Sequence, residues 1–132
     1  MISLKEQIEV IKVLPVAAMA VGSDNVVLDL EKYGHPADLL TAIFVEAVGT
    51  GGTLDIVISQ DNDAEGGFAD ILTQPDTISE AGDFLLQVTP GKRYLKFDMT
   101  VATAAVTFGI VAIAGNKRFK KTRDKVATIT GE

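Results

Sequence analysis

The segment from Arg93 to Ala114 constrains the fold more than any other part of the chain. Its first half alternates polar residues (Tyr94, Lys96, Asp98, Thr100) with apolar ones (Leu95, Phe97, Met99, Val101). This period of two predicts a strand with one apolar face. The second half, Val106 to Ala114, is apolar almost throughout, so we expect a strand with both faces covered. Two such strands, antiparallel and joined by a short loop of small residues, are typical of two sheets packed face to face.

Further strand patterns, separated by turn signals, fill most of the chain. Besides the two strands above, they are expected at 25–30, 38–48, 53–60, 68–74 and 83–88. Gly49, Gly51 and Gly52 mark a tight turn, so residues 38–60 are predicted to form a hairpin. No helical pattern lies between the strands. The sequence therefore predicts an all-β fold, an antiparallel β-sandwich or jelly roll of about seven to eight strands.

Both ends of the chain differ from this central pattern. We expect an N-terminal arm at 1–20, a sandwich domain at 21–116 and a basic C-terminal tail at 117–132. Ser3 and Glu6 resemble a helix capping box, but the β-branched residues up to Pro15 favour an extended arm, and both readings fit. In the tail, Val126 to Thr130 alternates well enough to add an edge strand to a neighbour.

Length and composition limit which classes of protein this chain can belong to. A chain of 132 residues that is 47% hydrophobic is large enough for one core, and it contains no cysteine. The apolar run Val10 to Val21 is too short to span a bilayer and is interrupted by Lys12 and Pro15. It also lacks the basic start of a secretory signal. We therefore expect a protein made in the cytoplasm that has no membrane partner.

Charge is distributed unevenly along the chain. Residues 1–116 carry six Lys/Arg and sixteen Asp/Glu, whereas residues 117–132 carry six Lys/Arg and two acids. Such segregation suggests that the body and the tail meet different surfaces, or that the tail is only a solvated segment. The acidic body would repel nucleic acid, so a nucleic-acid partner is not expected. An acidic protein surface fits the tail better.

No catalytic or metal-binding motif is complete. Asp61-Asn62-Asp63-Ala64-Glu65-Gly66 resembles the first half of a calcium loop, but Leu72 stands where the bidentate Glu belongs. A polar turn explains the same residues. His35 is the only histidine, which argues against a zinc site or a catalytic triad. We predict no enzyme, no cofactor and no metal.

Three phrases occur in an order that resembles a known family. They are Asn-Val-Val-Leu-Asp-Leu at 25–30, Ser-Gln-Asp-Asn-Asp…Phe at 59–68 and Pro-Gly-Lys-Arg-Tyr-Leu-Lys-Phe at 90–97, followed by an Ala/Thr/Val-rich last hairpin. In this layout the chain is similar to the small jelly-roll capsid cement, or decoration, proteins of tailed bacteriophages. The resemblance covers roughly residues 20–115, and the basic tail has no match in it.

The resemblance implies a non-enzymatic virion protein on the capsid exterior. Its partner would be the major capsid protein lattice, and it would form a homo-oligomer, a trimer rather than a dimer. We expect apolar arm contacts and electrostatic tail contacts, with Tyr33 and Phe68 as further anchors or core residues. The predicted contact residues are Ile2, Leu4, Ile8, Ile11, Lys117, Arg118, Phe119, Lys120, Lys121 and Arg123.

Two alternatives stay open. The first is another phage or bacterial structural β-sandwich, a component of a ring or fibre. The second is a carbohydrate-binding sandwich that uses the Asp61–Glu65 loop with calcium. The second needs exposed aromatic residues for stacking on sugars, and the chain has no Trp and only two Tyr.

Overall fold

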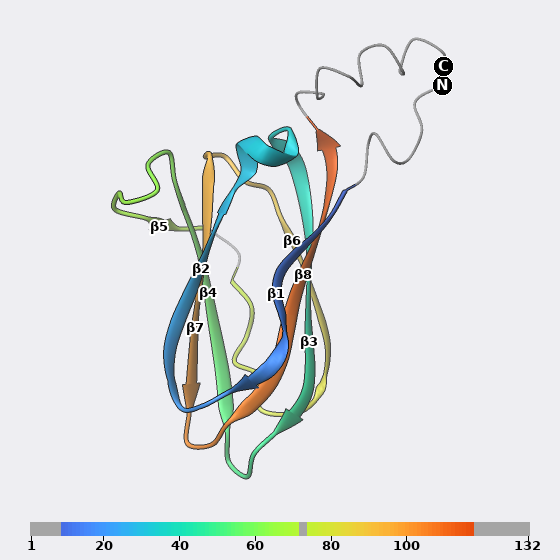
Figure 1. Ribbon diagram of the computed structural model, residues 1–132, viewed down its shortest axis with the longest axis vertical. Coiled ribbons are helices and arrows are strands. Elements are labelled where there is room, and N and C mark those ends of the chain that lie inside the picture. Colours follow the sequence, from blue (N-terminus) through green and yellow to red (C-terminus); the bar gives the residue numbers. More distant parts are fainter. Residues whose placement is uncertain (1–8, 72–73, 118–132) are drawn as a thin grey trace.

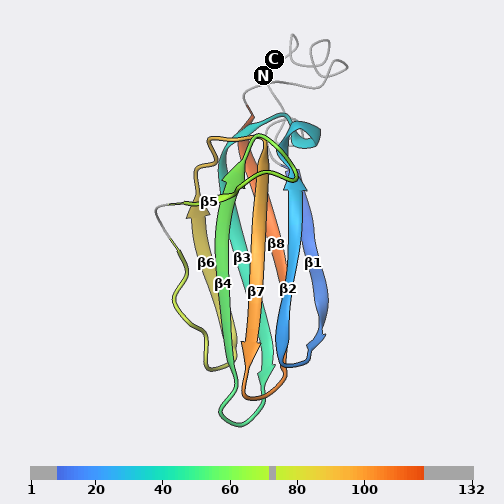
Figure 2. The ribbon, with the colours of Figure 1, turned by 90° about the vertical axis from the view of Figure 1, so that its left-hand side faces the viewer.

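Eight strands form two antiparallel four-stranded sheets packed face to face (Figures 1 and 2). The computed structural model describes residues 9–71 and 74–117. The strands are β1 (Glu9–Met19), β2 (Gly22–Asp29), β3 (Pro36–Val48), β4 (Thr53–Asp61), β5 (Ala69–Asp70), β6 (Gly82–Val88), β7 (Tyr94–Ala102) and β8 (Val106–Lys117), with a 3₁₀ turn η1 (Leu30–Tyr33). The predicted all-β antiparallel sandwich is confirmed.

The strand order is that of a jelly roll. One sheet, called sheet A here, has the order β1-β8-β3-β6, and the other, sheet B, has the order β2-β7-β4-β5. Consecutive strands lie in opposite sheets at every connection except β4 to β5. This alternation of eight strands between two sheets is the jelly-roll arrangement.

Both hairpins predicted from the sequence are therefore wrong. β3 and β4 do not pair, because β3 lies in sheet A and β4 in sheet B. The same holds for β7 and β8. These strands pair instead with partners that are distant in the sequence: β3 pairs with β8, and β4 pairs with β7. A short glycine-rich connection reverses the chain equally well within a sheet or between two sheets, so the turn signal does not decide the pairing.

The two reversals pack against each other at one end of the sandwich. Gly49 N donates to the carbonyl oxygen of Ala105 at 2.9 Å. A Cβ placed on Gly49 would lie 2.7 Å from the Cβ of Ala104, and one on Gly52 would lie 2.9 Å from the Ala104 oxygen. Small residues at these positions thus permit the close approach of two connections that are distant in the sequence.

The core fills the space between the sheets with alternate residues of the long strands. Its members in β7 are Leu95, Phe97, Met99 and Val101, and those in β8 are Val106, Phe108, Ile110, Ala112 and Ala114. The period-two pattern in residues 94–101 thus correctly predicts which face of β7 is inside.

The N-terminal arm is the largest correction to the expected domain organisation. Residues 9–19 are strand β1, an edge strand of sheet A that pairs with β8 from Glu9 opposite Ala114 to Met19 opposite Val106. They belong to the sandwich, and the helical reading is wrong for them. Register shifts on either side of Leu14 bulge the strand. Residues 1–8 lie outside the described part of the chain.

The strand expected at 68–74 is reduced to the two residues of β5. Beyond it, the Gln74 side chain takes the place of a paired strand along β4. Its Oε1 accepts from Ile58 N at 2.7 Å, and its Nε2 donates to the oxygens of Ile58 at 2.6 Å and Ile71 at 3.0 Å. A side-chain amide thereby satisfies backbone groups where the ladder ends.

Candidate partner-binding surface

The outer face of sheet A carries apolar side chains on all four of its strands. In register, Val10 of β1, Ile113 of β8 and Leu40 of β3 form one cross-strand row, which ends at Gln87 of β6. The next row begins at Lys12 of β1 and continues with Val111, Ala42 and Leu85. Val10 is 67% exposed, Leu85 66% and Leu40 39%. We call Val10, Leu40, Ala42, Leu85, Val111 and Ile113 the apolar face, in which Ala42 is covered by its larger neighbours and only 6% exposed.

The outer face of sheet B has the opposite character. Polar and charged residues alternate outward along its strands: Ser23, Asn25, Asp55, Lys96, Asp98 and Thr100. Lys96 and Asp98 form an ion pair at 3.7 Å on this face. The outer face of sheet B is therefore the more hydrated of the two, with Val27 (40% exposed) and Val57 (38%) as its exposed large apolar residues. Exposed apolar residues gathered on one face mark an interaction site.

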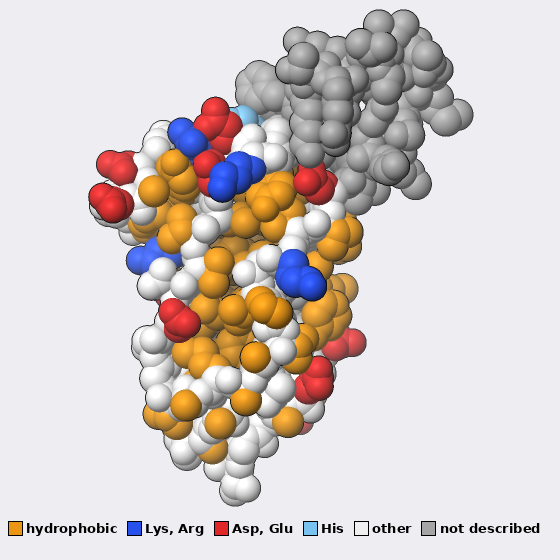
Figure 3. All heavy atoms as spheres, viewed as in Figure 1, with side chains coloured by type: hydrophobic (Ala, Val, Ile, Leu, Met, Phe, Trp, Pro, Cys, Tyr) orange, Lys and Arg blue, Asp and Glu red, His pale blue; other side chains and the backbone are white. Residues whose placement is uncertain are grey.

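Apolar residues also gather on the narrow side of the sandwich between β1 and β2 (Figure 3). A hollow of about 200 Å³ is lined there by Leu14, Met19, Met99 and Phe108, among others. Val16 lies directly over Gly109 of β8, so that a Cβ on Gly109 would lie 2.6 Å from a Val16 methyl group. Pro15 and the bulges interrupt this edge, and such features block pairing with another strand.

Most of the contact residues predicted from the sequence lie outside the described part of the chain. These are Ile2, Leu4, Ile8, Arg118, Phe119, Lys120, Lys121 and Arg123. Lys117 is the last residue of β8. Ile11 is 3% exposed and belongs to the core of its own sandwich, so its prediction as a surface contact is wrong. It points inward because it lies opposite Ala112, whose side chain also faces the core.

Tyr33 and Phe68, predicted as anchors or core residues, are both partly buried. Tyr33 packs against the core cluster from η1. Phe68 lies under the Lys96 ammonium group, which is 5.3 Å from the ring centroid. Among the described residues, every Phe and Tyr is at least partly buried.

At the end of the sandwich where η1 lies, Arg93, just before β7, pairs with acidic residues at the end of β2 and in η1. Its Nε and Nη2 donate to the two carboxylate oxygens of Asp29 at 3.0 and 3.1 Å, and Nη2 also lies 2.7 Å from Glu31 Oε2. The guanidinium hydrogen bonds lower the pKa of Asp29 below its ordinary value. The same pairing raises the pKa of Arg93. The paired arginine stabilises a corner of the fold.

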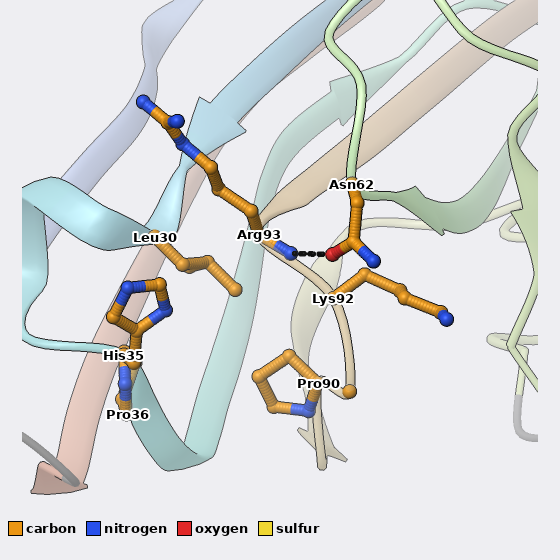
Figure 4. A pocket seen from close by; sticks show the side chains of 8 residues that line it. Leu30, His35, Pro36, Asn62, Pro90, Lys92 and Arg93 are labelled. Atoms are coloured by element: carbon orange, nitrogen blue, oxygen red, sulfur yellow. Dashed lines mark hydrogen bonds between the residues drawn. The ribbon is translucent and has the colours of Figure 1, made fainter.

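A small pocket of about 130 Å³ lies beside this corner (Figure 4). Leu30, His35, Asn62 and Lys92 are among its lining residues, and Arg93 N donates to Asn62 Oδ1 at 3.1 Å. Gly34 (φ 74°) and His35 (φ 48°) are both left-handed and turn the chain into β3. His35 is thus a loop residue beside a pocket, as its position before Pro36 predicts.

The acidic loop is closed by hydrogen bonds of its own. Asp61 Oδ1 accepts from Asp63 N at 3.1 Å, and Asp63 Oδ1 accepts from Glu65 N at 3.0 Å. These are the side-chain to backbone bonds typical of a polar turn. No group of three His, Cys, Asp or Glu residues with the geometry of a metal site occurs among residues 9–71 and 74–117. In the same part of the chain, no helix is long and apolar enough to cross a membrane.

The apolar face was not predicted from the sequence. A signal was present, because Val106–Ala114 is apolar at almost every position, and so is Leu39–Val45 apart from Thr41. We expected the second face of β8 to be covered. Its inner residues are buried, but Val111 and Ile113 on the outer side are only half-buried. The uncovered side of the doubly apolar strands is the surface that the structure identifies.

The fold places the chain among jelly-roll β-sandwiches, and known structures agree. The PBSX exported protein XepA superimposes with a TM-score of 0.63 at 12% identity, over 88% of this chain and 39% of that one. The CBM22-1-GH10 modules of Clostridium thermocellum endo-1,4-beta-D-xylanase 10B, complexed with xylohexaose, give 0.50 at 14% identity, over 86% and 27% of the two chains.

The CBM22-1 xylan-binding domain of Paenibacillus barcinonensis Xyn10C gives a TM-score of 0.49 at 13% identity, over 84% of this chain and 86% of that one. The chain spans well under half of the length of XepA. No protein-family model matches the sequence, and a search of curated proteins finds no similar one. At these identities the likeness concerns the fold alone.

Proposed function

We propose that this chain is a non-enzymatic capsid cement, or decoration, protein of a tailed bacteriophage, which binds the outer surface of the major capsid protein lattice. The observation that carries the proposal is the apolar face of sheet A, with Val10 and Leu85 two-thirds exposed. The ordered sequence phrases at 25–30, 59–68 and 90–97 indicate the kind of partner.

The physical role of the apolar face follows from the difference between the outer faces of the two sheets. Burying the apolar face against a partner removes that area from water, which is favourable by about 25 cal/mol per Å². The hydrated outer face of sheet B then points to solvent and keeps the decorated particle soluble. Cations at 117–125 would add attraction to an acidic surface that is screened by salt. In this proposal the protein is a homo-oligomer, a trimer rather than a dimer, on the capsid exterior.

A matched pair of substitutions tests the proposal. Leu85→Glu places a charge on the apolar face, and Val57→Glu places the same charge on the outer face of sheet B, where Val57 is 38% exposed. Both sites are exposed, so both variants should fold. We expect Leu85→Glu to weaken binding to expanded empty capsids at least tenfold in co-sedimentation, and Val57→Glu to bind like the unchanged protein.

The outcomes separate the candidate functions. Equal capsid binding by both variants would show that sheet A is not the docking surface. An unchanged protein that ignores capsids in sedimentation velocity would reject the cement function. A carbohydrate-binding sandwich is less favoured, because the described aromatic side chains are at least partly buried and the acidic loop bonds to itself.

A further inference from the structure

The two sheets end differently on the side of β6 and β4. In sheet B, β5 and the segment from Gln74 to Ile78 continue the pairing along β4, with Ile78 and Leu54 joined by two backbone hydrogen bonds of 2.8 and 2.9 Å. In sheet A, β6 is an edge strand in the described part of the chain, and its partner is β3. No backbone hydrogen bond joins β6 to residues 74–81, although residues of both segments line one groove.

A groove of about 410 Å³ lies between β6 and that segment. Its apolar lining includes Ile43, Ile78, Phe84 and Leu86, while Asp76 and Asp83 line it from the two sides. An edge strand with unpaired backbone groups beside an apolar groove is the arrangement that accepts an added strand, whose alternate side chains enter the groove.

We propose that the C-terminal segment of the same chain, residues 118–132, supplies this strand and pairs antiparallel with β6. β8 ends at Lys117, which lies opposite Pro36 at the beginning of β3. From there the outer edge of β6 is three strand spacings away, or about 14 Å at about 4.8 Å each. The eight residues 118–125 span up to about 26 Å at about 3.3 Å per residue, so they suffice to cross.

The remaining residues have the composition of a strand. Val126-Ala-Thr-Ile-Thr130 alternates, is β-branched at four of its five positions and contains no charge. The five of them match the length of β6 from Phe84 to Val88. The cations at 118–125 would pass the beginning of β3, where Asp38 lies. This docking does not depend on the capsid function, since it concerns the isolated protein.

Hydrogen exchange of β6 tests the docking. The full chain is compared with a chain that ends at Lys117, and exchange of the amides in residues 82–88 is measured by mass spectrometry. We expect about half of the β6 amides to exchange at least tenfold faster in the truncated chain, because alternate residues of a strand point their N–H groups to opposite edges. Ile129→Asp in the full chain should have the same effect, and Ile129→Val should not.

Control experiments show which segment pairs with β6. Deletion of residues 1–8 should leave β6 exchange unchanged. Equal β6 exchange in the full and truncated chains would overturn the proposal. Protection that rises with protein concentration, together with a dimer in sedimentation velocity, would also overturn it, because the strand would then come from a second copy.

Discussion

Thr41 is an exception in the core of the sandwich. It lies on the inner side of β3, opposite Ala112 of β8 and Leu86 of β6, and is fully buried. Its hydroxyl has no hydrogen-bond partner among the described residues. A buried hydroxyl without a partner costs free energy, because it has lost its bonds to water. The apolar run of β3 is thus interrupted by a group that destabilises the fold.

Thr41→Val should raise the free energy of unfolding by about 1 kcal/mol, because a methyl group replaces the unpaired hydroxyl and the side chain stays β-branched. Thermal or urea unfolding measures the change. Thr41→Ala is the control, and it should be less stable than Thr41→Val because it leaves a small void. A loss of stability in Thr41→Val would mean that the hydroxyl is bonded in solution.

Asp29 shows how one residue serves two purposes. It accepts both guanidinium hydrogen bonds of Arg93, and its Oδ1 also accepts from Glu31 N at 3.1 Å, which caps η1. Its side chain is 18% exposed. The phrase at 90–97 marked this corner in the sequence, but the pairing of Arg93 with Asp29 depends on the β2–β7 register.

The lowered pKa of Asp29 makes stability depend on pH. As pH falls below about 4, the unfolded chain takes up this proton before the folded one does, so the folded state loses the contribution of Asp29. We expect Asp29→Asn to be less stable than the unchanged protein at pH 7, with the difference shrinking towards pH 2. Urea titrations across this range measure it. Asp70→Asn, at an exposed site on β5, is the control and should leave the free energy of unfolding at pH 7 nearly unchanged.

At the scale of elements, the edge of β4 is closed by a side chain instead of a strand. Gln74→Ala removes three hydrogen bonds, among them the one that Ile58 N donates, whereas Ile58 O keeps the bond that it accepts from Ile71 N at 3.1 Å. We expect a loss of about 1–3 kcal/mol in the free energy of unfolding and faster hydrogen exchange at Ile58. Gln87→Ala, which removes a single 3.4 Å bond to Asp38, is the matched control. Equal effects of the two variants would show that Gln74 does not close the edge.

Strand positions were predicted well, and strand partners were not. The alternation of residues 94–101 predicts β7 and its inner face, because side chains on opposite faces meet different surroundings. It carries no information on whether β7 bonds to β8 or to β4. The short extent of β5 was also missed, since beyond it the edge of β4 is completed by the Gln74 side chain and by isolated backbone bonds from Ile71 and Ile78 instead of a continuous strand.

At the scale of the whole molecule, the alternation of strands between sheets predicts slow folding. Only β4 and β5 are consecutive strands that pair, through two residue pairs. All other strand pairs join segments that are distant in the sequence. Closing the long loop between two such segments costs conformational entropy before their contacts form. We expect refolding in milliseconds to seconds, measured by stopped-flow dilution from urea. Refolding within microseconds would contradict this.

The outer faces of the two sheets differ in polarity. The apolar face of sheet A and the polar face of sheet B both arise from ordinary alternation, but in sheet A several outward residues, among them Val10, Leu40 and Ile113, are also apolar. Only the strand order brings Val10, Ile113 and Leu40 into one row. The candidate binding surface is therefore a property of the sheet and of no single strand.

The amino-acid sequence by itself determined that this protein is all-β, where most strands begin and end, and which side of β7 is buried, because these depend on local alternation and turn residues. It also favoured a polar turn for the acidic loop, which the hydrogen bonds of Asp61 and Asp63 then showed. The tertiary structure alone decided that β1 belongs to the sandwich, that the glycine turn at 49–52 joins two sheets, and that the apolar face is continuous. These depend on which strands pair across the chain, and backbone hydrogen bonds are nearly the same for every possible partner.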